Sequence, residues 1–168
     1  NVINPDEVIE KFGADTLRTY EMFMGPIEAD KPWDVRAVIG VYRFWQRFFD
    51  LVLKSIEMGK SAKDSKEKAL EAHLPVLQKL HRTIQKVSAD IPSLKFNTAI
   101  AALMEFVNTW EAAKEVYLPV DQLSKAIRLI APFAPYLAEE LYQRLQGTEQ
   151  STVDLETSVH GADWPEVD

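Results

Sequence analysis

The segment from residue 34 to residue 58, DVRAVIGVYRFWQRFFDLVLKSIEM, predicts a long amphipathic helix that decides the fold class. Apolar side chains recur in it every three or four residues, at Val38, Val41, Tyr42, Trp45, Phe48, Phe49, Val52 and Ile56. This spacing gathers them on one face of a helix, and that face has to be buried against other elements. Asp34 directly precedes the pattern and is suited to cap the helix at its start.

The rest of the chain also has a helical pattern, and no segment before residue 150 shows the alternation of a half-buried strand. Pro5 suits the first turn of a short helix that Asn4 caps and Gly13 ends. A polar linker at residues 59–66 follows the long helix. We expect the other helices at residues 14–24, 67–89, 98–114, 121–130 and 136–145.

Caps and breaks fix the expected ends of these later helices. Asn97 and Asp121 each precede an apolar periodic stretch, so we predict that both act as N-caps. Pro75 lies inside the expected helix at 67–89, where its ring and its missing N–H disturb the helix, so we expect a break or a kink near His73.

Helices joined by short polar links predict an all-α fold, an up-and-down helical bundle preceded by two short helices. We divide the chain into a leading junction segment at residues 1–34, the bundle at residues 35–150 and an exit tail at residues 151–168. The same architecture serves many unrelated functions, so the fold by itself does not identify one.

Composition narrows the class of protein. The chain has 168 residues and no cysteine, and no apolar run approaches the roughly 18 residues of a membrane span. We therefore expect no membrane partner and a cytoplasmic location. The net charge of −7 argues against a nucleic-acid partner, but residues 35–95 carry twelve Lys or Arg and six Asp or Glu, a local balance of +6. That segment suits an anionic contact.

Two rows of basic residues lie in this positive segment. The row on the long helix has spacings of 7, 4 and 7 residues and consists of Arg36, Arg43, Arg47 and Lys54. The row on the next helix has spacings of 3 and 4 residues and consists of Lys79, Arg82 and Lys86. Rows of this kind on neighbouring helices could follow a phosphate backbone, which makes these residues the candidate positions for binding a nucleic acid. The alternative is an ordinary solvated face, on which Asp50 partly pairs with Arg47.

No pattern in the chain predicts a catalytic or metal site. His73, His81 and His160 have no carboxylate pair at ligand spacing, so we interpret them as surface or partly packed residues. Glu139 and Glu140 are adjacent and therefore point to different parts of a helix surface, which indicates a solvated edge and not an acid–base pair.

Aromatic side chains are concentrated around the long helix, at Trp33, Tyr42, Phe44, Trp45, Phe48 and Phe49. A platform on which bases stack is one interpretation of such a cluster. Packing in the core and between segments is the other, and it is the one we favour. Trp110 and Trp164 are interpreted as packing residues in the same way.

Several segments resemble a known family. Residues 1–26, NVINPDEVIEKFGADTLRTYEMFMGP, resemble the stretch that follows the flexible catalytic loop of class I aminoacyl-tRNA synthetases. DKPW at residues 30–33 and GVYRFWQRFFDLV at residues 40–52 resemble the leucyl-tRNA synthetases of bacterial type. The helical anticodon-binding domain of that family and the exit from it are similar, in order, to LHRTIQKVSADI (80–91), LKFNTAIAALMEFVN (94–108), LIAPFAPYLAEELYQRL (129–145) and VHGADWPEVD (159–168).

The resemblance implies a function. The family attaches leucine to its tRNA through an adenylate made from ATP, with Mg²⁺. Its two nucleotide-handling motifs do not occur in this sequence, so we expect a fragment of a longer enzyme that is inactive alone and holds no catalytic, cofactor or metal residue. The implied partners are leucine-specific tRNA, met through its backbone, and the catalytic core of the same parent chain. We expect the fragment itself to be a monomer.

Two other interpretations remain beside this one. The chain could be a structural docking module of a related isoleucyl or valyl synthetase, with no RNA contact of its own, or an independent metal-dependent or hydrolytic enzyme, which the sequence does not favour. If a catalytic core normally covers the leading helices, some apolar side chains there should be exposed. The residues concerned are Val8, Ile9, Phe12, Met22 and Phe23.

Overall fold

The computed structural model describes residues 4–26, 32–61, 66–114, 116–147 and 154–167, and these residues form helices and connecting segments without a strand. The α-helices are α1 (Pro5–Phe12), α2 (Ala14–Phe23), α3 (Val35–Ser61), α4 (Lys66–Asp90), α5 (Phe96–Ala112), α6 (Val120–Ile130) and α7 (Pro135–Gln146). Short 3₁₀ turns, η1 (Ile91–Ser93) and η2 (Val159–Gly161), follow α4 and α7 along the chain. The all-α prediction is confirmed.

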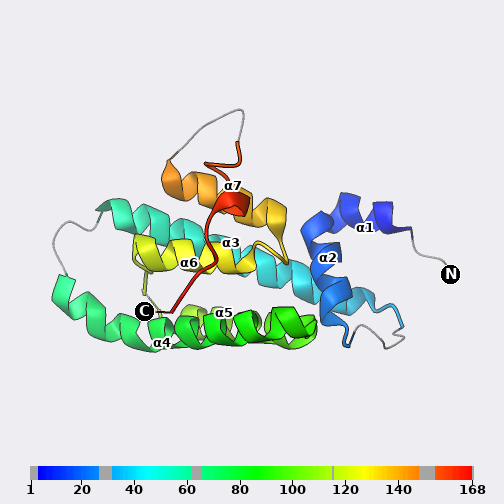
Figure 1. Cartoon of the computed structure of the whole chain (residues 1–168), viewed down its shortest axis with the longest axis horizontal. Coiled ribbons are helices and arrows are strands. Elements are labelled where there is room, and N and C mark those ends of the chain that lie inside the picture. The colour runs from blue at the N-terminus through cyan, green and yellow to red at the C-terminus, as the bar shows by residue number, and fades with distance from the viewer. Residues whose placement is uncertain (1–3, 27–31, 62–65, 115, 148–153, 168) are drawn as a thin grey trace.

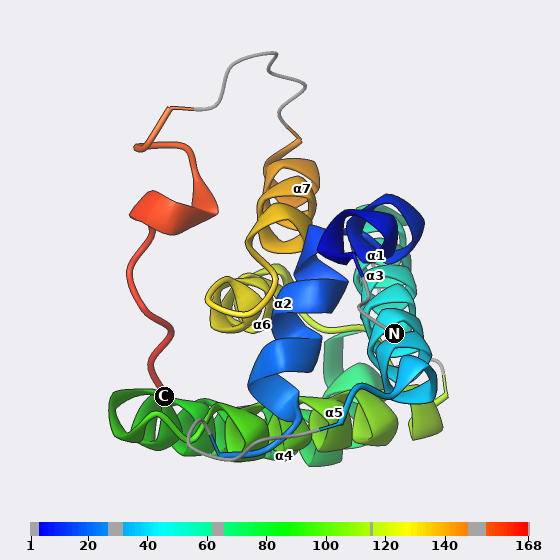
Figure 2. The same ribbon diagram turned by 90° about the vertical axis from the view of Figure 1, so that its right-hand side faces the viewer.

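The helices form a bundle with α4 and α5 along one side (Figure 1). α3 and α6 lie above this pair, and α7 lies above them. α2 crosses the bundle near one end and packs against α3 and α5, with α1 beside it (Figure 2). The final segment runs from η2 toward α4, on the side of α6 that is away from α2.

Some helix ends follow the local sequence rules. The Asn4 side chain accepts a hydrogen bond from the Asp6 N–H at 3.0 Å, and Gly13 ends α1 with φ of 86°. Asp34 accepts from the Arg36 N–H at 2.9 Å and so caps α3. Both predicted caps are confirmed, since each satisfies an N–H group that has no partner inside its own helix.

Other predicted ends are wrong. α5 begins at Phe96, with Lys95 as its N-cap and no side-chain cap, because the Lys95 carbonyl already accepts the Ala99 N–H at 3.1 Å, the first hydrogen bond of the helix. α6 begins after Pro119, whose carbonyl accepts the Leu123 N–H at 2.7 Å, so Asp121 lies inside the first turn.

Pro75 does not break its helix. α4 is one continuous helix from Lys66 to Asp90, with Pro75 inside it. Of the two outcomes expected near His73, the break therefore does not occur. The predicted linker at 59–66 is shorter than expected, because α3 continues to Ser61 and α4 starts at Lys66. Residues 62–65 between them lie outside the described residues.

The aromatic cluster of α3 belongs to the core. Phe44, Trp45 and Phe48 are 3%, 5% and 1% exposed. Phe48 meets Trp110 of α5 edge to face with ring centroids 6.3 Å apart, a favourable geometry for aromatic pairs. The interpretation as packing is thus confirmed for these residues, while Tyr42 and Phe49 remain partly exposed at the edge of the core.

Hydrogen bonds tie α2 into the bundle. The Trp45 Nε1–H donates to Thr19 Oγ1 at 3.0 Å, and the Thr19 hydroxyl donates to the Phe133 carbonyl at 3.1 Å. Thr19 is fully buried, so this chain of bonds joins α2, α3 and the turn before α7 inside the core. We call it the Thr19 bridge.

The leading helices are only partly exposed. Ile9 is 40% exposed, in line with the expectation that some of these side chains are exposed, whereas Val8 is only 6% exposed. Val8 belongs to the continuous core because α1 packs against α2, and α2 lies within the bundle. Phe12, Met22 and Phe23 are partly buried against that core.

Replacing Thr19 with valine should destabilise the chain by roughly 1–3 kcal/mol, since it leaves a buried indole N–H and a buried carbonyl without partners. Equilibrium urea unfolding measures this loss. Thr109→Val is the matched control, because the Thr109 hydroxyl only bonds the Glu105 carbonyl of its own helix. Equal unfolding free energies for the two variants would contradict a structural role for the Thr19 bridge.

Candidate nucleic-acid interface

The basic row on α3 divides into exposed and engaged residues. The Arg36 side chain is 92% exposed beside Asp34, and Arg43 and Lys54 are also exposed. Arg47 instead reaches α5, where its guanidinium donates to Asn108 at 2.6 Å and lies 2.6 Å from Glu111. The predicted pairing with Asp50 is wrong, because α5 packs beside α3 and presents these oxygens to Arg47.

The basic row on α4 divides in the same way. Lys79 is paired with Glu105 of α5 at 2.6 Å, and this hydrogen bond lowers the pKa of Glu105. Lys86 is paired with Asp90 at 2.6 Å, one turn further along α4. Arg82, between the two lysines, is exposed. A groove of about 410 Å³ separates this row from Thr98, Ala101 and Ala102 of α5.

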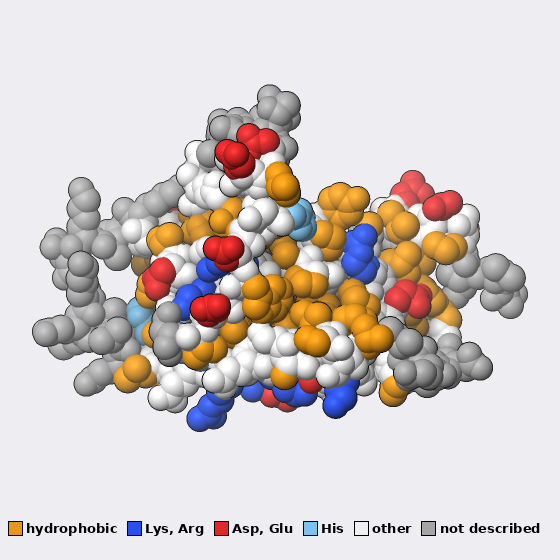
Figure 3. All heavy atoms as spheres, viewed as in Figure 1, with side chains coloured by type: hydrophobic (Ala, Val, Ile, Leu, Met, Phe, Trp, Pro, Cys, Tyr) orange, Lys and Arg blue, Asp and Glu red, His pale blue; other side chains and the backbone are white. Residues whose placement is uncertain are grey.

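The two basic rows therefore lie on opposite sides of α5. Some of their side chains are already paired with carboxylates and are less available to bind an anion. Arg47 and Lys79 hold α5 against its neighbours, and Lys86 holds the end of α4. The exposed cations of the two rows are Arg36, Arg43, Lys54, Arg82 and Lys86, and of these Lys86 is held by the buried carboxylate of Asp90. Figure 3 shows Lys and Arg side chains along the edge formed by α4 and α5, with acidic side chains between them.

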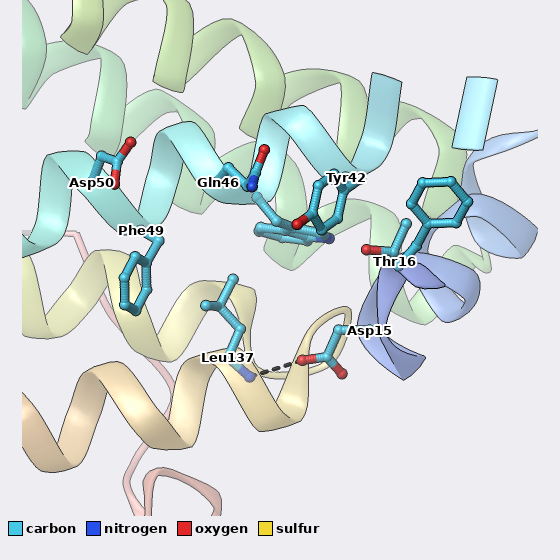
Figure 4. Close-up of a pocket in the computed structure, with 9 residues that line it drawn as sticks. Asp15, Thr16, Tyr42, Gln46, Phe49, Asp50 and Leu137 are labelled. Carbon is cyan, nitrogen blue, oxygen red and sulfur yellow. Dashed lines mark hydrogen bonds between the residues drawn. The ribbon is translucent and has the colours of Figure 1, made fainter. Parts of the chain in front are cut away.

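A cavity of about 550 Å³ lies on the other side of the α3 row, between α2, α3 and α7 (Figure 4). Phe49 and Tyr42 of α3 point across it toward Leu137 of α7. Asp15 closes its lower end, where its carboxylate accepts the Leu137 N–H at 2.7 Å and pairs with Arg18 at 2.9 Å. Burial raises the pKa of Asp15, although both of these contacts act in the opposite direction.

Glu139 has a role that the sequence analysis missed. Its carboxylate accepts the Ser158 hydroxyl at 2.6 Å and the Val159 N–H at 3.1 Å, and so holds η2 against α7. Trp164 in the same tail donates to Ser88 of α4 at 2.8 Å. The interpretation of Glu139 as a solvated residue is therefore wrong, because the tail folds back over it. Glu140 is exposed and pairs with Arg144.

The histidines fit the interpretation as surface or partly packed residues. His81 Nε2 lies 3.0 Å from the Gln122 side-chain oxygen, burial lowers the pKa of His73, and His160 is exposed. Among the residues that the structure describes, no group of three His, Cys, Asp or Glu side chains could hold a metal ion. No helix in this part of the chain is long and apolar enough to cross a membrane.

Comparison with known proteins gives consistent matches. The family model described as the anticodon-binding domain of tRNA ligase matches residues 73–168. The chain is 39% identical over 168 residues to a leucine–tRNA ligase of Borrelia garinii and 41% identical over 167 residues to one of Phocaeicola vulgatus. The first match covers 100% of this chain and 18% of the relative, and the second covers 98% of this chain and 16% of the relative. The chain therefore spans less than a fifth of the length of these relatives.

A solved structure is similar over the whole chain. It is the crystal structure of the ternary complex of Agrobacterium radiobacter K84 agnB2 LeuRS with tRNA and LeuAMS. The TM-score is 0.79 at 27% sequence identity, and the match covers 100% of this chain and 21% of that one. The similarity therefore extends from sequence to the arrangement of helices.

The contacts of Asp90 predict an acid-sensitive end of α4. Burial by itself would raise the pKa of Asp90, but hydrogen bonds from Lys86 and Thr98 and the charges of Lys86 and Lys95 lower it overall. A lowered pKa contributes stability that is present above the ordinary Asp value of about 3.9 and is lost as the pH falls through the lower folded value. Asp90→Asn should therefore be less stable than the parent chain at pH 7, by roughly 1–3 kcal/mol, with the difference shrinking below about pH 4.

Urea unfolding between pH 7 and pH 3 measures this difference. Glu156→Gln is the control, because it removes an exposed carboxylate in the tail. A constant difference between Asp90→Asn and the parent chain at every pH would show that the charge of Asp90 does not contribute.

Proposed function

Since this chain belongs to the family of anticodon-binding domains of tRNA ligases, we propose that it is the tRNA-binding helical domain of a leucine–tRNA ligase. The observation that carries the proposal is the match over the entire chain, in sequence with leucine–tRNA ligases and in fold with a LeuRS–tRNA complex. Isoleucyl and valyl ligases, the alternative parents, are less well supported because the full-length relatives named above are leucine ligases.

The parent enzyme, in this proposal, joins leucine to its tRNA with the help of ATP and Mg²⁺. We assign ATP and Mg²⁺ to parts of the ligase outside this chain. The same proposal includes contact with the catalytic core of the parent, a monomeric state of the isolated chain, and a cytoplasmic location, where tRNA is charged for protein synthesis.

We propose that the domain binds tRNA mainly through phosphates. Arg43, Lys54 and Arg82 are exposed, and Arg36 is exposed with its Nε 3.5 Å from the Asp34 carboxylate, so none of the four would lose a partner on another helix by reaching a phosphate. Arg47 and Lys79 are weaker candidates than the sequence suggested, because each would have to leave an α5 carboxylate 2.6 Å away, and Lys86 is weaker because it would have to leave the buried carboxylate of Asp90 at the same distance. Contacts to phosphates position a nucleic acid without reading its sequence.

A docking module without RNA contact is the second candidate function. Its support is electrostatic, because the α5 carboxylates Glu105 and Glu111 partly neutralise both rows and the whole chain carries −7. In that case the basic rows would be solvated, and only the catalytic core would bind. Titration of the chain with a leucine tRNA transcript at about 50 mM salt separates the two functions, since phosphate contacts are strongest at low salt.

Arg43→Ala and Arg82→Ala should each weaken tRNA binding and reduce the slope of log affinity against log salt concentration by roughly 0.7–0.9, the value for one lost phosphate contact. Fluorescence anisotropy at several salt concentrations measures both quantities. The loss should be similar for leucine tRNA and for an unrelated tRNA, because phosphates carry no sequence information.

Lys79→Ala is the matched control for Arg82→Ala on the same helix. Its slope should change less, because Glu105 already neutralises Lys79. No detectable binding by the parent chain at about 50 mM salt would contradict the RNA-binding proposal and favour the docking module. Unchanged slopes in both arginine variants would remove these residues from the interface.

A further inference from the structure

The cavity between α2, α3 and α7 is lined in part by α3 residues that share a helix face with Arg43. Gln46 and Asp50 line it, and they follow Arg43 by three and seven residues, so the three side chains lie along one face of the helix. A phosphate held by Arg43 would therefore lie next to the opening. A volume of about 550 Å³ is within the usual range for small-molecule sites, roughly 300–1,000 Å³.

The walls of the cavity are suited to a flat ring. Phe12, Tyr42 and Phe49 supply aromatic surface, and all three are partly exposed. Phe12 and Tyr42 are fixed against each other edge to face, with ring centroids 5.7 Å apart. Aromatic side chains beside a cationic row are the usual elements with which proteins bind unstacked bases of RNA.

The polar groups favour a particular kind of base edge. Asp50 and Gln46 are exposed on the rim, whereas the Asp15 carboxylate is already engaged by Leu137 and Arg18. Asp50 can only accept hydrogen bonds when it is ionised, and Gln46 can donate and accept. The exocyclic amines of cytosine, adenine and guanine are donors that suit a carboxylate, and uracil has none.

We propose that this cavity binds one unstacked base of the tRNA, with an exocyclic amine directed at Asp50 and the adjoining phosphate at Arg43. The inference rests on the proposed tRNA binding and adds to it a contact that reads a base. Tyr42 and Phe49 would stack on the ring, and Gln46 would hydrogen-bond its edge. The carboxylate of Asp50 would repel a phosphate, so the backbone has to lie on the Arg43 side.

Asp50→Ala gives the sharpest test, because the proposal and simple electrostatics predict opposite signs. Removing a negative charge from the surface should tighten binding to a polyanion. If Asp50 bonds a base, its removal should instead weaken binding of the leucine tRNA transcript by roughly tenfold or more, the loss of about one hydrogen bond to a charged group. Gln46→Ala should weaken it too.

Glu57→Ala is the matched control, since it removes an exposed carboxylate from the same helix beyond the cavity. Its tRNA affinity should stay equal to that of the parent chain or rise. Unchanged or tighter binding by Asp50→Ala, with the parent chain still binding tRNA, would overturn the base site and leave the proposed function intact. A parent chain that does not bind tRNA would overturn both.

Nucleotides alone provide a second readout. In ¹H–¹⁵N spectra of the chain, millimolar CMP should shift the Leu137 amide and the Gln46 side-chain amide, and these shifts should be lost in Asp50→Ala. UMP should shift them less. No shift with CMP, or an equal response to UMP and CMP, would overturn the assignment of the cavity to an amine-bearing base.

Discussion

The Thr19 bridge is the constraint on which the other features depend. It joins Trp45 of α3 to Phe133 before α7 through a single buried hydroxyl of α2. Because buried polar groups need partners, α2 can occupy only the position that satisfies all three groups. That position brings Asp15 to the first turn of α7 and closes the cavity between α2, α3 and α7. The leading helices are thereby part of the bundle core.

A second constraint is the competition between packing and binding for the same cations. α5 carries carboxylates toward both neighbours, and these engage Arg47 and Lys79. Exposed ion pairs of this kind contribute only about 0–1 kcal/mol each, so they hold little stability, but they reduce the charge available to a polyanion. The cations without a close carboxylate partner are fewer than the sequence pattern suggested. Arg43 shares a face of α3 with Gln46 and Asp50 of the cavity lining, so it is the one best placed to combine a phosphate contact with a base contact.

The sequence predicted what local periodicity and capping determine. The buried face of α3 and the caps Asn4 and Asp34 follow from residues a few positions apart. The predictions from sequence were wrong where the contacts of a side chain depend on segments that are distant in the chain. The partner of Arg47 depends on α5, and the role of Glu139 depends on a tail that returns to α7. The rows were correctly seen as helical faces, but which members stay exposed is a property of helix packing. The division of the chain into three segments and the RNA contacts themselves stay predictions.

In the proposed interface, exposed cations of α3 contact tRNA, and the cations paired across helices do not. Lysine acylation with and without saturating leucine tRNA at about 50 mM salt, read by mass spectrometry, tests it directly. Lys54 is exposed and Lys79 is paired with Glu105. We expect tRNA to slow the acylation of Lys54 several-fold and to change that of Lys79 little. Protection of Lys79 with no protection of Lys54 would contradict it.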